Sequence, residues 1–138
     1  MAIAALITWL LTAAGGFVLL STWISKGATR QPGTTQLPPP VVFGHFLLAV
    51  VGLIVWIIYL FTDQDALAWT AFILLIPVAL LGLFMFARWL PVYRAQSAPG
   101  PQEAAEGHFP VAVVAGHGVF AVTTVVLVLL AALGVGGS

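Results

Sequence analysis

The sequence predicts an all-α integral membrane protein, a bundle of four transmembrane helices that forms a single membrane domain over residues 1–138. Composition is the first reason. Of the 138 residues, 62% are hydrophobic and 6% are charged, whereas soluble globular domains carry roughly 25% charged residues. Because so few charges cannot cover a water-facing surface, most of the chain must face lipid. Four long apolar stretches and an internal repeat are the other two reasons.

Each apolar stretch reaches the roughly 20 residues that a helix needs to cross the hydrocarbon core. The predicted helices cover about 2–24, 41–61, 67–90 and 109–133. The first has no basic segment ahead of it, and Trp23 and Lys26 stand where a cleaved signal peptide needs small residues, so we expect a retained helix. The proline-rich connections 25–40 and 91–108 are expected to be extended. A tight turn at 62–65 is expected to join the second and third helices.

The basic residues predict the orientation. All of them fall at one predicted membrane face: Lys26, Arg30, Arg88 and Arg94. The positive-inside rule then places connections 25–40 and 91–108 in the cytoplasm and both termini outside, in a bacterial-type plasma membrane. Trp23, Trp89 and Tyr93 are predicted to form an aromatic belt at the same face.

The chain also contains an internal repeat. Sliding it by 72 positions aligns the string P-x-x-V-V-x-G-H-x-x-x-A-V that begins at Pro38 with the same string from Pro110. A shift of 66 aligns the first stretch with the third more weakly and matches Gly16 with Gly82. We therefore predict two tandem two-helix repeats related by a pseudo-twofold axis along the membrane normal. The repeats are residues 1–64 and 65–138.

The repeat places His45 and His117 at the same depth on opposite sides of that axis. Ionisable residues inside a membrane are costly and face the bundle interior with a partner, so this pair is the candidate site. Small residues follow each histidine on its own helix face: Ala49, Gly52, Ala121 and Thr124. They favour a slot for a flat haem between the helices, with the imidazoles as axial ligands to the iron and Arg88 as partner of a propionate. Close packing of small residues without a cofactor is the competing interpretation.

Two further residues have less defined roles. Met85 is predicted at the depth of His45 and His117, and the three side chains would offer nitrogen and sulfur ligands to copper. Packing among neighbouring Leu and Phe is the simpler interpretation of Met85. His108 precedes the fourth helix and has no counterpart in the first repeat, so we interpret it as a solvated loop residue.

Composition excludes several functions. Nucleic-acid binding needs clustered Lys and Arg, of which the chain has four, and disulfides and thiolate metal sites need cysteine, of which it has none. The sequence contains no hydrolase, P-loop or dinucleotide-binding motif, and no carboxylate is predicted inside the membrane. An electron-transfer or accessory protein is therefore favoured over an enzyme or a proton-driven pump.

A bundle with His45 on its second helix and His117 on its fourth resembles the bis-histidine cytochrome b class of membrane proteins. The resemblance implies a haem b held without covalent attachment, and electron exchange with quinone, ascorbate-like donors or a redox partner protein. It also implies assembly as a homo- or hetero-oligomer. The chain differs from two-haem members because it has only two intramembrane histidines, both toward one face, so electron transfer across the whole membrane is not implied.

The leading hypothesis is a haem b-binding membrane protein, with bis-histidine ligation near the cytoplasmic face, that acts in electron transfer or as a respiratory-complex subunit. Two alternatives remain open. One is a cofactor-free structural or accessory subunit of a larger membrane complex, whose histidines bond to each other or to lipid headgroups. The other is a small transporter or binder of a metal ion or an apolar ligand.

Overall fold

The computed structural model describes residues 1–97 and 104–137. Its elements are α1 (Ala2–Ser25), α2 (Pro39–Thr62), α3 (Asp65–Arg94), η1 (Ala95–Ser97), η2 (Ala105–His108) and α4 (Val111–Ala132). The four α-helices are each long and apolar enough to cross a membrane, which confirms the predicted all-α architecture and indicates a multi-pass integral membrane protein. Part of the predicted connection 91–108, residues 98–103, lies outside the described residues, as does Ser138.

The structure corrects three of the predicted helix boundaries, each of them next to a proline. α2 begins at Pro39 rather than after Pro40, because proline suits the first turn of a helix, where its missing N–H would have no partner. α3 continues through Pro91, where a connection was predicted, and ends at Arg94. Neighbouring helices make an interior proline tolerable in such a segment. α4 begins after Pro110, two residues later than predicted.

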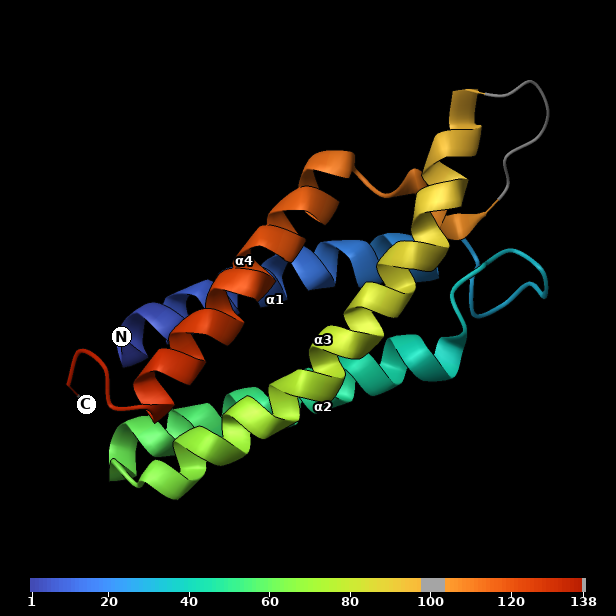
Figure 1. Cartoon of the computed structure of the whole chain (residues 1–138). Coiled ribbons are helices and arrows are strands. Elements are labelled where there is room, and N and C mark those ends of the chain that lie inside the picture. The colour runs from blue at the N-terminus through green and yellow to red at the C-terminus, as the bar shows by residue number, and fades with distance from the viewer. Residues whose placement is uncertain (98–103, 138) are drawn as a thin grey trace.

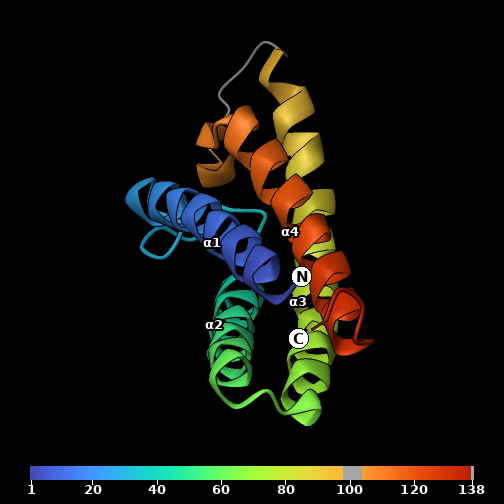
Figure 2. The same cartoon turned by 90° about the vertical axis from the view of Figure 1, so that its left-hand side faces the viewer.

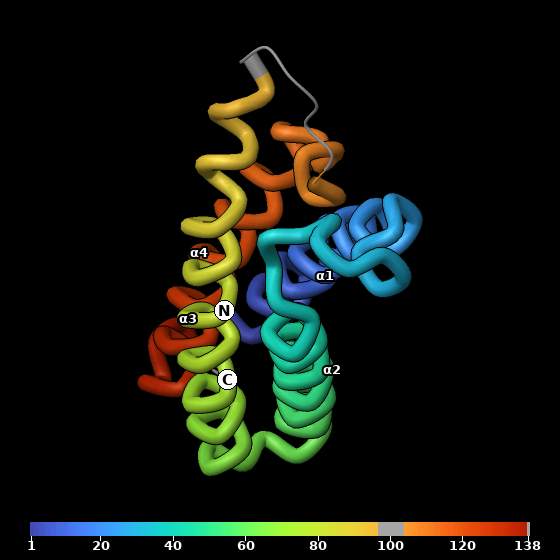
Figure 3. The backbone as a smooth tube through the Cα atoms, turned by 90° about the vertical axis from the view of Figure 1, so that its right-hand side faces the viewer, coloured from blue at the N-terminus to red at the C-terminus, as the bar shows by residue number. Residues whose placement is uncertain are grey.

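The helices pack in two pairs, α1 with α4 and α2 with α3. Figures 2 and 3 show α2 and α3 side by side, with the C-terminal end of α3 projecting beyond α2. Both termini and the α2–α3 turn lie at one end of the bundle, and the connections after α1 and α3 lie at the other (Figure 1). We call these the terminal end and the loop end. The turn is the predicted tight one, and Asp63 closes α2 in a left-handed conformation with φ 52°.

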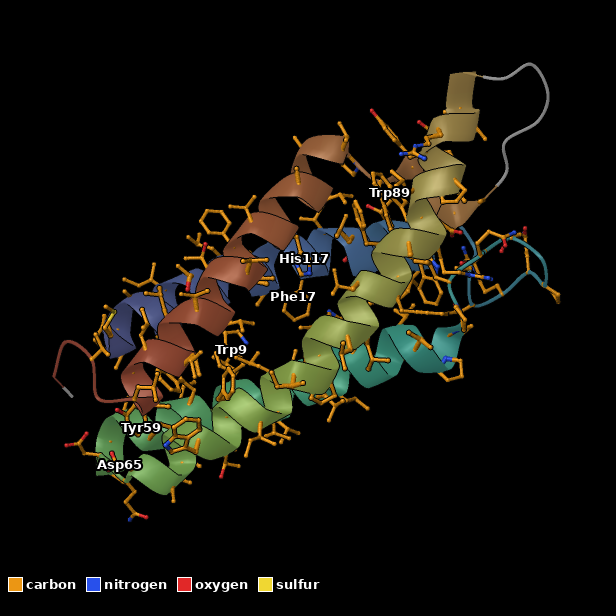
Figure 4. The ribbon with its side chains drawn as sticks, in the orientation of Figure 1. Trp9, Phe17, Tyr59, Asp65, Trp89 and His117 are labelled. Carbon is orange, nitrogen blue, oxygen red and sulfur yellow. The ribbon has the colours of Figure 1, made fainter. Side chains whose placement is uncertain are left out.

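The buried side chains form two separate clusters rather than one core. The terminal-end cluster is centred on Trp9, Trp56 and Tyr59, and Figure 4 shows Trp9 and Tyr59 toward that end. The loop-end cluster contains these buried residues: Trp23, Ala28, Leu37, Val42 and Ala105. His117 lies between Trp9 and Trp89 along the bundle (Figure 4). The core is therefore divided at the depth of the predicted site.

The predicted aromatic belt is wrong for two of its three members. Trp23 is 1% exposed and Trp89 is 5% exposed, so both indole rings lie inside the protein. Only Tyr93, which is 40% exposed, is available to lipid headgroups. The tryptophans are buried because the connections after α1 and α3 fold back over them and accept hydrogen bonds from their indole N–H groups.

Candidate functional site

The structure brings the two predicted histidines together between the helix pairs. His45 comes from α2 and His117 from α4, their ring centroids lie 6.3 Å apart, and their planes are inclined by 62°. Both side chains are partly buried. The pair thus joins one helix of each packed pair at the layer that separates the two hydrophobic clusters.

Each imidazole is held through the same ring atom. Nδ1 of His45 lies 2.8 Å from the main-chain oxygen of Val78 on α3, and Nδ1 of His117 lies 2.8 Å from that of Thr12 on α1. Because a carbonyl only accepts, each Nδ1 carries the hydrogen and donates it. This tautomer leaves the lone pair on each Nε2 available, as in histidines that bind metals.

Glycines let both rings approach the neighbouring helix closely. A Cβ atom at Gly16 would lie 3.1 Å from Cε1 of His117, and one at Gly82 would lie 3.2 Å from Cε1 of His45. A larger residue at either position would force the ring or the backbone to move. The two glycines therefore make room for the hydrogen bonds to the carbonyls one turn earlier on the same helices.

The two glycines that precede the histidines face open space. Gly44 and Gly116 immediately precede His45 and His117, and a Cβ atom at either glycine would meet no heavy atom within 4 Å. Both glycines are partly buried. Each Gly-His pair thus consists of a hydrogen-bonded imidazole and a preceding glycine that faces open space.

The slot predicted beyond the histidines is not open at two of its positions. Gly52 is covered by Trp9 of α1, whose Cζ2 atom would lie 3.1 Å from a Cβ there. The Thr124 hydroxyl oxygen lies 2.9 Å from that of Thr8. The other two slot positions, Ala49 and Ala121, are partly buried.

The remaining predicted residues lie nearer the loop end. Arg88 donates from Nε to the main-chain oxygen of Gln36 at 2.8 Å, so it is held by the α1–α2 connection. Met85 packs against the loop-end cluster. His108 is exposed, as expected for a solvated loop residue.

The spacing of the two histidine rings can be compared with that of two imidazoles bound to one metal ion. Imidazole nitrogens bind metals at about 2 Å, so two imidazoles on opposite sides of one ion have ring centroids about 6 Å apart, close to the observed 6.3 Å. Within residues 1–97 and 104–137, no group of three or more His, Cys, Asp or Glu side chains could close a metal site. A metal ion held at this layer would have His45 and His117 as its imidazole ligands.

Sequence reasoning missed the buried carboxylate of Glu106. This side chain is 0% exposed; its Oε1 accepts from the N–H of Gln36 and its Oε2 accepts from the Thr35 hydroxyl at 2.8 Å. Trp23 donates to the Thr35 hydroxyl oxygen at 2.8 Å, and Trp89 donates to the main-chain oxygen of Glu106 at 3.1 Å. The shift of 66 positions also aligns Trp23 with Trp89, and this match is a sequence signal for the two indoles that donate into the network.

Comparison with known proteins identifies no relative, because no family model, curated protein or solved structure matches the chain. The interpretation of the site therefore depends on its own contacts.

Proposed function

We propose that the protein binds haem b in the membrane through His45 and His117 and acts as an electron carrier or as a redox subunit of a larger complex. The observation that supports this proposal is the geometry of the histidine pair. The ring centroids lie 6.3 Å apart, close to the spacing of two imidazoles bound to one metal ion, and a carbonyl orients each ring through Nδ1. A haem bound by two histidines supplies one-electron transfer. The proposal makes the protein a carrier rather than an enzyme, with quinone or a redox protein as its partner.

Residues of the neighbouring helices orient the two imidazoles. Hydrogen bonds from Nδ1 to the carbonyls of Val78 and Thr12 fix the tautomer and raise the basicity of Nε2, which strengthens its bond to a metal. The hydrophobic clusters on either side limit access of water to this layer. Arg88, bound to Gln36 at the loop end, stays available as a cation near that face but does not contact the imidazoles.

The proposal includes the duplication of a two-helix unit. His45 bonds to Val78, and His117 bonds to Thr12. The two histidines are 72 positions apart and the two carbonyl residues are 66 apart, which are the two shifts found in the sequence. Gly16 and Gly82, which contact the rings, obey the second shift as well. The packing of α1 with α4 and of α3 with α2 is the pattern that a pseudo-twofold axis would produce. We further propose that the loop end, which carries the basic residues, faces the cytoplasm.

An absorption spectrum of the detergent-purified protein, expressed with ample haem, tests the function. We expect a Soret band that shifts on reduction, with one haem per chain, and its loss in both His45→Ala and His117→Ala. His108→Ala is the matched control, because it removes the exposed third histidine and should leave the spectrum unchanged. A colourless preparation, or a band that survives both substitutions, contradicts the proposal. Elemental analysis of the same samples separates iron from copper bound by the same imidazoles.

A cofactor-free accessory subunit is the second candidate, and one observation favours it. Each imidazole already makes a hydrogen bond that ties its helix to its packing partner, α2 to α3 and α4 to α1. Such a protein would be colourless and metal-free, and the two histidine substitutions would lower its thermal stability while changing no spectrum.

A further inference from the structure

The loop end contains a pocket that lies apart from the histidine pair and shares only Arg88 with the residues predicted for the haem site. It has a volume of about 400 Å³. The α1–α2 connection forms most of it, and α3 contributes Arg88. Because the connection joins two membrane-spanning helices, the pocket lies at the level where a bilayer meets water.

Two arginines from different segments line this pocket, Arg30 and Arg88. None of its lining residues, all of them in the described part of the chain, is acidic. The nearest carboxylate of the connection's network, that of Glu106, is fully buried and already accepts hydrogen bonds from Thr35 and Gln36. The positive charge in the pocket is therefore not neutralised by a lining side chain.

The pocket is also organised to receive an anion. The bond from Nε of Arg88 to the Gln36 carbonyl fixes one edge of the guanidinium and leaves its terminal Nη groups for a ligand. Arg30 is oriented through Nη2 by the main-chain oxygen of Ser25 at 3.3 Å. Arginine pairs of this kind suit phosphate, whose oxygens accept two N–H bonds from one guanidinium.

We propose that this pocket binds a phosphate group of net negative charge, carried at this depth by an anionic phospholipid or by a soluble phosphate ester. Basic residues next to transmembrane helices attract anionic lipid headgroups at the membrane surface. The site is independent of the histidine pair, so it stands whether or not haem is bound.

Native mass spectrometry of the purified full-length chain tests the site with three probes: phosphatidylglycerol, phosphatidylcholine and glycerol 3-phosphate. We expect phosphatidylglycerol to bind more tightly than phosphatidylcholine, and Arg88→Gln and Arg30→Gln each to weaken it about fivefold. Lys26→Gln is the control, because it removes an equal charge from the same connection outside the pocket lining and should change affinity less than twofold.

The probes also identify the source of the phosphate. Displacement of phosphatidylglycerol by glycerol 3-phosphate supports a soluble ester, and its failure to displace supports the lipid. Equal binding of the two lipids, or an equal loss in Lys26→Gln, overturns the proposal. Arg30→Gln keeps the test valid if loss of the Arg88–Gln36 bond disturbs the connection, because Arg30 donates to Ser25 and its substitution leaves the Arg88–Gln36 bond in place.

Discussion

Single glycines set how closely each imidazole approaches its neighbouring helix. Gly82→Ala would place a methyl group 3.2 Å from Cε1 of His45, a ring that the bond to Val78 prevents from moving freely. We expect it to destabilise the protein by about 1–3 kcal/mol, as overpacking does, and to weaken metal or haem binding by displacing the imidazole. Thermal unfolding in detergent measures the first effect, and titration of the purified apoprotein with haem measures the second.

A matched alanine substitution separates crowding from any general effect of replacing glycine. Gly118 lies on α4 at an exposed position, where a Cβ atom meets nothing within 4 Å. We therefore expect the free energy of unfolding of Gly118→Ala to stay within about 0.5 kcal/mol of that of the parent protein. If Gly82→Ala were as stable as Gly118→Ala, the close approach of His45 to α3 would not be required.

At the scale of elements, the buried Glu106 joins the segments that follow α1 and α3. Glu106→Ala removes the acceptors of the Gln36 N–H and the Thr35 hydroxyl, both in partly buried bonds, and leaves the hydroxyl its longer contact with the main-chain oxygen of Leu37 at 3.3 Å. We expect a loss of about 1–3 kcal/mol, because the Gln36 N–H loses its partner and one donor left without a partner costs about that much. Glu106→Gln should cost less, since one amide oxygen remains to accept from Gln36.

Thermal unfolding followed by circular dichroism measures the loss, with Asp65→Ala as the control. Asp65 is an exposed carboxylate at the start of α3, so its removal should change stability far less. Equal losses in Glu106→Ala and Asp65→Ala would mean that the network does not hold the two connections together.

The helices themselves follow from composition, but their ends depend on tertiary contacts. Apolar length located all four spans, since a chain with few charges must place them outside lipid. The ends of α2 and α3 could not be located in this way, because Pro39 and Pro91 are compatible with either a helix or a connection until their neighbours are known. Burial of Trp23 and Trp89 likewise required the connections to fold over them.

At the site too, composition and pattern predict some features, whereas others depend on tertiary contacts. His45 and His117 could be singled out because an ionisable residue repeated in register inside a membrane is rare, and the structure places their rings together. Their carbonyl partners and the covering of Gly52 by Trp9 were not predictable, because they depend on which helices pair in the bundle. Glu106 was missed because a loop glutamate has no periodicity that indicates burial.

At the scale of the whole molecule, the α1–α2 connection and the α2–α3 turn lie at opposite ends of the bundle (Figure 1), so four helices that span a membrane would place them on opposite sides of it. The chain has no cysteine, so single cysteines can report the side. We expect Gln64→Cys, exposed in the turn, to react with a membrane-impermeant maleimide in intact cells. Gln31→Cys, exposed in the connection, should react only after the membrane is permeabilised, because in the proposed orientation the basic residues retain that end in the cytoplasm. Labelling of both from one side would contradict the four-span arrangement, whereas the reverse pattern would preserve the fold and invert the proposed orientation.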